Sequence, residues 1–158
     1  MKNVIKLAVS TIAATLLASC GDGGYETGFS PPTGDEKYSE IFPDQVSGTP
    51  ADIQLLELDG KLYKGAVATY GTGVSVTALL CKDQDALDDY VKTTGVPKLE
   101  NYNNRSSAKV NGVWRFRGNG STGRIYGWQN GAWVFSIEAT DDTLFDEAVS
   151  KFPYISKK

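Results

Sequence analysis

The chain contains no histidine among its 158 residues. A Ser-His-Asp or Cys-His catalytic arrangement is therefore excluded, and no imidazole can bind zinc. Cysteine is scarce, with only Cys20 and Cys81. No glycine-rich loop leads from a predicted strand into a helix, as phosphate-binding loops do. These absences remove the commonest kinds of enzyme. The main hypothesis is a non-enzymatic protein with no catalytic residue, metal ligand or cofactor.

The first residues have the features of an export signal. Lys2 and Lys6 form a short basic start before an apolar run, residues 7–17. That run is shorter than the roughly 20 residues needed to span a membrane. It ends in the letters LASCG, in which the cysteine is Cys20. This arrangement resembles the lipobox of bacterial lipoproteins, and the resemblance covers residues 1–21.

The resemblance implies where the protein is located and does not imply an activity. Residues 1–19 would be a signal peptide removed in the mature protein. Cys20 would then carry a thioether-linked diacylglycerol and an acylated amine, and would tether the protein to a membrane facing the periplasm. In Gram-negative bacteria an aspartate directly after the lipidated cysteine favours the inner membrane. Here that position is Gly21 and the aspartate is Asp22, which favours the outer membrane and leaves the inner membrane open.

Composition divides the rest of the chain into two parts. Residues 20–45 are rich in glycine, proline and acids without periodicity, which predicts a lipidated flexible tether. Docking of Tyr38, Ile41 and Phe42 onto the domain would end this tether early. Residues 46–158 have the length of a single domain. Removing Lys2 and Lys6 changes the formal charge from -3 to -5. A mildly acidic protein is not expected to bind nucleic acid.

The patterning of residues 46–158 predicts an α+β fold. Asp59-Gly60 and Asn111-Gly112 are strong signals for two-residue hairpins. Strands joined by short turns run antiparallel, so we predict an antiparallel sheet with two helices packed on one side, in the order βββα followed by βββα. The predicted strands and helices occupy residues 53–58, 61–70, 74–81, 84–93, 108–110, 113–116 and a strand–turn–strand–helix unit over 123–152.

The last unit resembles an earlier part of the chain at an offset of 58 residues. Val76 then matches Val134, and Asp83 matches Asp141 as the N-cap of a helix. A structural pseudo-repeat is one interpretation, and ordinary α+β patterning that occurs twice is the other.

The acidic run after Asp83 begins like a calcium loop, but Leu87 and Asp88 stand where an oxygen ligand and a glycine are required. We interpret the run as a capped helix with a solvated acidic face. The same offset matches Cys81 to Ala139, which predicts a packed, inert thiol.

The most informative surface feature is a cluster of arginines. All four, Arg105, Arg115, Arg117 and Arg124, fall within 20 residues. Arg115 and Arg117 point to one face of their strand. A hairpin partner carrying Arg124, Tyr126 and Trp128 would place them close by, although the register is not fixed by the sequence. Arginine beside exposed aromatic rings suits a carboxylate, phosphate or sugar ligand. The alternative is a solvated sheet face paired with acids such as Glu138, with the aromatic side chains in the core.

Three functions follow from these observations. The first is a tethered, non-enzymatic module of the cell envelope that binds an envelope protein or an anionic ligand through Arg115, Arg117, Arg124, Tyr126 and Trp128. The second is a cell-wall or glycan hydrolase that uses two carboxylates, one with a raised pKa. The third is an accessory lipoprotein that matters only within a larger envelope complex. In each of them the membrane is reached through lipid on Cys20.

Overall fold

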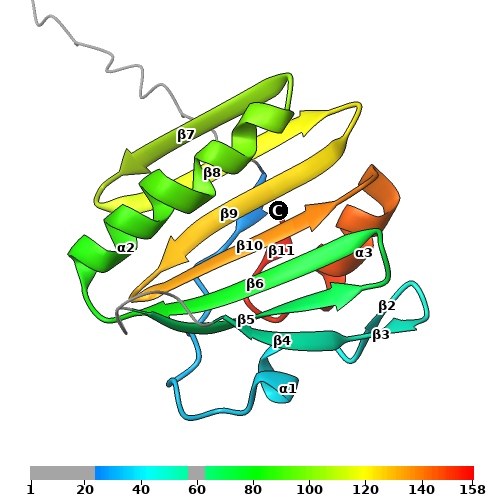
Figure 1. Ribbon diagram of the computed structural model, residues 1–158, viewed down its shortest axis with the longest axis horizontal. Coiled ribbons are helices and arrows are strands. Elements are labelled where there is room, and N and C mark those ends of the chain that lie inside the picture. The colour runs from blue at the N-terminus through cyan, green and yellow to red at the C-terminus, as the bar shows by residue number, and fades with distance from the viewer. Residues whose placement is uncertain (1–23, 57–62) are drawn as a thin grey trace, which may run out of the picture.

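A computed structural model describes residues 24–56 and 63–158. Its centre is a seven-stranded antiparallel sheet in the order β4-β5-β6-β10-β9-β8-β7 (Figure 1). The two halves of the chain meet where β6 pairs with β10. This confirms an α+β fold built on an antiparallel sheet. The strands and main helices are β4 Asp52–Leu56, β5 Tyr63–Tyr70, β6 Val74–Cys81, α2 Gln84–Tyr90, β7 Asn104–Val110, β8 Val113–Gly120, β9 Gly123–Asn130, β10 Trp133–Ala139 and α3 Asp142–Lys151.

Short elements complete the described chain. A π turn and a 3-10 turn, Val91–Gly95 and Pro97–Asn101, follow α2. The N-terminal strand β1 pairs with the C-terminal strand β11. A separate small hairpin is formed by β2 and β3. The bounds of these elements are β1 Tyr25–Glu26, α1 Tyr38–Ile41, β2 Gln45–Val46, β3 Thr49–Pro50 and β11 Ser156–Lys157. None of the described helices is long and apolar enough to cross a bilayer.

The two main helices lie on opposite faces of the sheet. On β10, Phe135 and Ile137 point into a core with α3, whereas Val134 points into a second core with α2. Figure 1 shows α2 in front of the sheet and α3 behind it. We call these two sides the α2 face and the α3 face. The prediction that both helices pack on one side is therefore wrong. Apolar residues alternate to both faces of the central strands, and each face needs its own cover.

The repeat holds for the order of elements and not for their arrangement in space. In the strand order β5-β6-β10-β9, a structural repeat would relate the hairpin β5–β6 to the hairpin β9–β10 by a two-fold axis perpendicular to the sheet. Such an axis would place both helices on the same face. Instead, Val76 points to the α3 face and its match Val134 to the α2 face. The two ββα units thus have opposite hand and cannot be superposed. The second half contains four strands, β7 to β10, at the four positions predicted for strands, so the predicted order βββα is one strand short for this half.

Both predicted N-caps are present. The Asp83 carboxylate accepts a hydrogen bond from the backbone N–H of Ala86 at 2.9 Å. The Asp141 carboxylate accepts one from the backbone N–H of Leu144, also at 2.9 Å. Each bond satisfies a donor that the first turn of a helix leaves without an intrahelical partner. Each strand–helix unit therefore begins its helix in the same way.

The β7–β8 hairpin is longer than the sequence predicts. Asn111 and Gly112 form its turn with φ angles of 51° and 80°, as the Asn-Gly signal requires. The strands extend over residues 104–120, whereas the prediction gave 108–116 and a polar connection before it. Every residue of β7 is exposed, so the strand has no apolar alternation to reveal it. The second predicted turn, Asp59-Gly60, lies outside the described residues.

The segment before residue 46 belongs to the folded domain. Tyr25, Ile41 and Phe42 are buried in the α3 core. The docking considered for Ile41 and Phe42 is therefore confirmed, and the flexible tether predicted over residues 20–45 is wrong from residue 24 onward. Residues 20–23 lie outside the described chain. In this glycine-rich segment the apolar side chains are far apart in the sequence, and each enters the core separately. No periodic pattern marks such a segment as folded.

Candidate functional site

The α3 face is covered at its centre and open at one end. Helix α3 packs on β10 and its neighbours β6 and β9. Beyond them, alternate residues of β7 and β8 point to the α3 face, and none of the described helices lies over them. We call this area the open face; its residues are Asn104, Ser106, Ala108, Arg115, Arg117 and Asn119. Across the strands Ser106 pairs with Arg117, which in turn pairs with Tyr126. The open face is therefore a regular grid of polar and cationic side chains.

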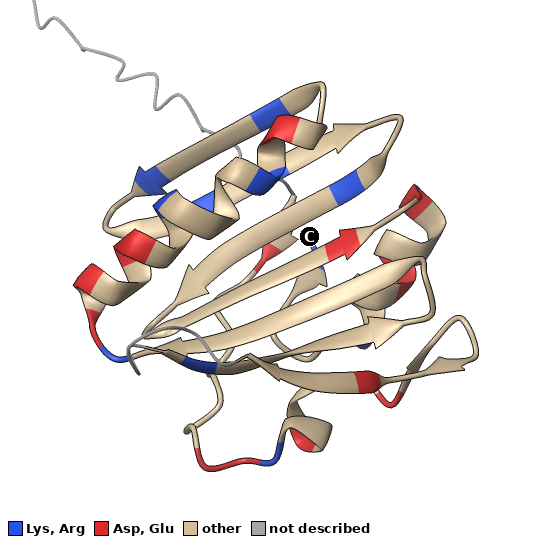
Figure 2. Cartoon of the chain, in the orientation of Figure 1, with Lys and Arg blue, Asp and Glu red and all other residues tan. Residues whose placement is uncertain are grey.

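The three strands at this end of the sheet carry only positive charge. Residues 101–137 contain five cations and no acid, a formal charge of +5 in a chain of -3, which leaves -8 for the remainder. Figure 2 shows lysine and arginine on β7, β8 and β9 and no acidic residue on them. In a net acidic protein this concentrates the positive potential at one place, which attracts anionic partners.

Two of the five cations are neutralised by acids. Lys109 forms an ion pair with Asp88 at 2.7 Å. Arg124 lies 3.3 Å from the Asp142 carboxylate.

The three remaining arginines have no carboxylate partner among the described residues. Arg105 donates to the carbonyl oxygen of Leu99, and the Nε–H of Arg117 donates to the hydroxyl of Ser106 at 3.1 Å. The Nε of Arg115 is buried without a described hydrogen-bond partner. The charge of Arg115 and Arg117 is therefore available on the open face.

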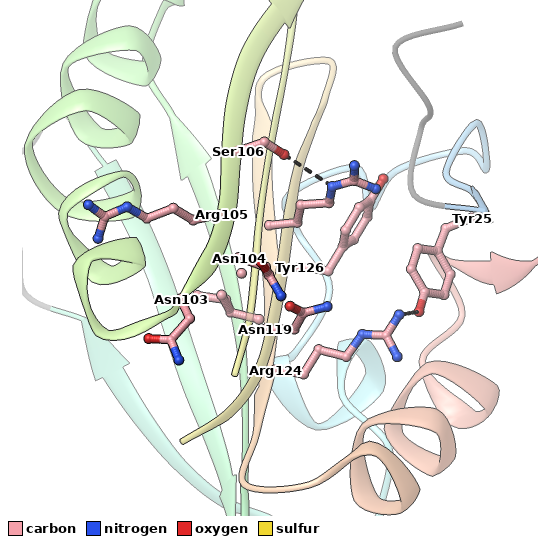
Figure 3. A pocket seen from close by; sticks show the side chains of 11 residues that line it. Tyr25, Asn103, Asn104, Arg105, Ser106, Asn119, Arg124 and Tyr126 are labelled. Carbon is pink, nitrogen blue, oxygen red and sulfur yellow. Dashed lines mark hydrogen bonds between the residues drawn. The ribbon is translucent and has the colours of Figure 1, made fainter. Parts of the chain in front are cut away.

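A cleft of about 480 Å³ lies beside the open face. Figure 3 shows Tyr25 and Arg124 on one side of it, joined by a hydrogen bond from the guanidinium to the phenol oxygen at 2.8 Å. Asn119 and Ser106 line the same cleft, whereas Arg105 points away from Tyr25. Burial raises the pKa of Tyr25, so its hydroxyl stays neutral and can still donate its proton.

The lining of the cleft consists of hydrogen-bond donors and amides. It combines arginine, asparagine, serine and tyrosine side chains, and it includes no carboxylate among the described residues. Guanidinium groups bind carboxylates and phosphates through forked hydrogen bonds. The arrangement is therefore suited to an anionic group.

The register resolves the predicted position of Arg124. It pairs with Asn119, so its side chain lies on the same face as Arg115 and Arg117. Its guanidinium is 4.7 Å from the centre of the Phe145 ring and is also bound by Asp142 and Tyr25. Arg124 therefore helps to hold the cleft wall, and Arg117 presents the freer guanidinium.

The two predicted aromatic residues are not exposed. Tyr126 is 2% and Trp128 0% exposed. The Tyr25 ring lies over Tyr126 with 4.8 Å between ring centres, and Trp128 packs on Phe135. Neither can offer a free ring to a ligand, because the N-terminal segment and α3 cover β9. On this point the alternative, aromatic side chains in the core, describes the structure.

Sequence reasoning missed part of the site. Tyr25 was assigned to a tether, and Asn104 and Ser106 to a connection between the two halves. Asn119 was assigned to a loose turn, but it lies in β8. The absence of acids from residues 101–137 is a signal that could have drawn attention to all of β7 and β8.

Two acids considered in the sequence analysis have partners outside the open face. Glu138, a predicted partner of the arginines, instead accepts a hydrogen bond from Tyr102 and lies 4.0 Å from Lys98. Asp88, predicted to be solvated, binds Lys109 and the indole N–H of Trp114. No group of three metal-ligating acids or cysteines is found within the described residues.

Every described carboxyl group with a resolved pKa shift has its pKa lowered. Side-chain hydrogen bonds from Lys109 and Trp114 lower that of Asp88 to about 2. Backbone N–H donors lower that of Glu36 to about 2, and the Lys151 ammonium lowers that of Glu147. A general acid in glycoside hydrolysis needs the opposite shift.

The single cysteine of the described chain is buried. Cys81 is 2% exposed in the α2 core, which confirms its predicted packing. Burial raises the pKa of its thiol to about 12. The thiolate that would act as a nucleophile is therefore almost absent near neutral pH.

The fold and the site together define an α+β protein with a basic, uncovered sheet face beside a small cleft. No family model matches the chain, and no curated protein or solved structure is significantly similar to it.

Proposed function

We propose that the protein is a lipid-anchored, non-enzymatic module of the cell envelope that binds an anionic partner on its open face. The observation that supports this most directly is the state of Arg115 and Arg117. They are alternate residues of β8 on one face of the strand, and no carboxylate neutralises them within the described part of the chain.

The energetics of Arg115 support a binding role. A buried N–H group without an acceptor costs about 1–3 kcal/mol. The Nε of Arg115 is such a group, and the indole nitrogen of Trp128, its direct pairing partner on β9, is another. Solubility alone does not require an arginine at position 115, because a serine or threonine there would also keep this part of the sheet polar. The residue as a whole is half-buried, so an anion on the open face would meet its guanidinium group, while the Nε atom itself stays closed to solvent.

The anchor supports a place in the envelope. The lipobox-like sequence around Cys20 predicts attachment to a membrane facing the periplasm, with the outer membrane favoured. A tethered domain meets its partners at a raised effective concentration, so a modest intrinsic affinity is sufficient. The open face can therefore act with few contacts.

The hydrolase hypothesis receives less support. It requires two carboxylates about 5–10 Å apart in a cleft, one with a raised pKa. The cleft beside the open face has no carboxylate among its described lining residues. We therefore favour binding over catalysis.

A titration followed by NMR tests the proposal. The probes are inorganic phosphate and, separately, a hexaglutamate peptide. We expect saturable shifts of backbone amides in residues 104–119, because Arg115 and Arg117 would bind the anion. The shifts should disappear in the Arg115→Ala/Arg117→Ala variant.

The matched control is Lys82→Ala/Lys92→Ala. It removes the same charge from two exposed positions on the other side of the protein. Equal weakening by both pairs of substitutions, or no saturable shift with either probe, would contradict the proposed site.

A further inference from the structure

We infer that the open face docks on the anionic phospholipid headgroups of the bilayer that holds the anchor, with the tip of the β7–β8 hairpin at the interface. This inference rests on the proposed function and names its partner. Its argument combines the surface chemistry of the hairpin, the point where the chain enters the domain, and the charge of the opposite face.

The hairpin presents apolar and cationic side chains in successive rows of one face. Val110 and Val113 pair at the tip and are 47% and 37% exposed. The next rows on the same face contain Arg115, opposite Ala108, and then Arg117. Surfaces that lie in a membrane interface place apolar groups at the acyl boundary and arginines at the phosphates. The hairpin has this order along its length.

The chain enters the domain on the same side of the sheet. Tyr25 lies over Tyr126 on the α3 face, and Gly24 accepts a hydrogen bond from the backbone of Lys158. Cys20 precedes Gly24 by four residues, which span at most about 14 Å when fully extended. Lipid on Cys20 would therefore hold the α3 face near the bilayer.

A third exposed apolar side chain belongs to the entering segment. Phe29 is 37% exposed, and its carbonyl oxygen accepts a hydrogen bond from Asn130 at the end of β9. The nearby acids are already engaged. Asp142 binds Arg124, and Glu26 accepts hydrogen bonds from the backbone of Thr27 and Gly28. The positive potential of the open face is thus opposed by few free carboxylates.

The opposite face is unsuited to an anionic bilayer. It carries α2, whose exposed acids include Asp85 and Asp89, and the 3-10 turn adds Glu100. These acids stand among cations such as Lys82 and Lys92, so this side has mixed charge and lacks the excess of cations found on the open face. The distribution of charge therefore favours the orientation with the open face toward the membrane and α2 away from it.

A second copy of the chain is a poorer occupant. Antiparallel pairing of two β7 edges about Ser107 would place Arg105 opposite Lys109 of the other copy. Like charges directly opposite each other destabilise such a pair. An extended acidic peptide on the same strands remains an outcome of the experiment below.

The experiment uses the chain from residue 20 with Cys20→Ser, so that only the domain can bind. The described residues of both cores lie between positions 24 and 158, and this chain includes all of them. Sedimentation is measured with vesicles of phosphatidylethanolamine alone and with about 30% phosphatidylglycerol added. We expect binding only with phosphatidylglycerol, and a loss of binding as salt rises.

Substitutions then locate the surface. Each arginine near an anionic bilayer contributes about fivefold in affinity, so Arg115→Ala/Arg117→Ala should weaken binding about 30-fold. Val110→Glu/Val113→Glu should weaken it about tenfold, because it places charge at the apolar tip. The controls are Lys82→Ala/Lys92→Ala and Leu55→Glu; the latter alters an exposed apolar residue on the far edge strand. We expect changes below about twofold for both controls.

The outcomes separate this inference from the proposed function. Equal weakening by test and control substitutions would mean attraction by net charge, and would overturn the docking surface. Shifts with phosphate or hexaglutamate at residues 104–119, without binding to phosphatidylglycerol vesicles, would overturn the membrane as partner and leave the proposed function standing. A lack of response to all three probes would overturn both.

Discussion

Two regions of the same sheet face differ in what covers them and in the side chains they carry. On β9 and β10, Trp128 and Phe135 point to the α3 face and are sealed by α3 and the N-terminal segment. On β8, Arg115 points to that face beside Trp128, and Arg117 points to it in the next row, beside Tyr126; no described helix covers them. The covered region therefore supplies stability, and the open region is free to carry another role.

The open region is nevertheless held firmly from behind. On the α2 face, Phe116 is 2% exposed and packs with α2 residues such as Leu87. The Phe116 ring lies so close over Gly127 that a β-carbon there would come within 2.0 Å of it. Any other residue at position 127 would displace the ring. The hairpin thus presents its open face from a fixed support, as a binding surface requires.

The largest predicted effect on stability comes from a substitution in the covered region. Phe135 is fully buried, and its ring centre lies 5.4 Å from that of Trp128 and 5.6 Å from that of Trp133. We expect Phe135→Ala to lower the free energy of unfolding by about 3–5 kcal/mol, because the removed ring leaves a cavity. Urea denaturation followed by tryptophan fluorescence measures the change.

The control for this substitution is Leu55→Ala at a side chain that is 68% exposed. It should change the free energy of unfolding by less than about 0.5 kcal/mol. A similar small change for Phe135→Ala would show that the core of the α3 face is not packed as described.

A smaller effect is predicted for Asp88, which supports the β7–β8 hairpin from the α2 face, behind the open face. The Asp88 carboxylate binds Lys109 at 2.7 Å and the indole N–H of Trp114 at 2.9 Å, so it ties α2 to both strands of the hairpin. Solvent and salt screen this contact, and we expect Asp88→Asn to lower the free energy of unfolding by about 1 kcal/mol. Asp85→Asn, on the same helix, should change it by less than half as much.

The pH dependence gives a second readout for Asp88. Its pKa in the folded protein is lowered to about 2 from an ordinary value of 3.8. The ionised form is therefore stabilised by folding, and its contribution is complete above the ordinary pKa and is lost as the pH falls through the folded one. The difference in stability between the unmodified protein and Asp88→Asn should shrink between about pH 4 and pH 2. A difference that stays constant over this range would contradict the ion pair.

The sequence predicts the covered region far better than the open one. Alternation along residues 133–139 and the cap at Asp141 identify β10 and α3, because burial imposes a period on the residues. The edge strand β7 has no such constraint, and its start at Asn104 was missed. The opposite placement of the helices was also missed, since apolar residues on both faces of β6 allow either side.

The candidate site was only partly predictable for the same reason. The arginines stand out by type, and their common face follows from strand alternation. The burial of Tyr126 depends on Tyr25, which is about 100 residues away in the chain and belongs to a segment without pattern. Contacts of that kind are set by tertiary packing and leave no local signal.

The smallest predicted effect concerns the open region itself. Arg115→Ala/Arg117→Ala removes one hydrogen bond to Ser106 and no described ion pair. It also removes a buried N–H group that has no described acceptor. Loss of the bond destabilises and loss of the unsatisfied group stabilises, so we expect a change in the free energy of unfolding within about 0.5 kcal/mol of zero. Urea denaturation of the double variant beside Lys82→Ala/Lys92→Ala measures it. A loss of 2 kcal/mol or more would mean that the arginines hold the sheet together. A change near zero, together with lost binding, would assign them to the surface that the fold leaves open.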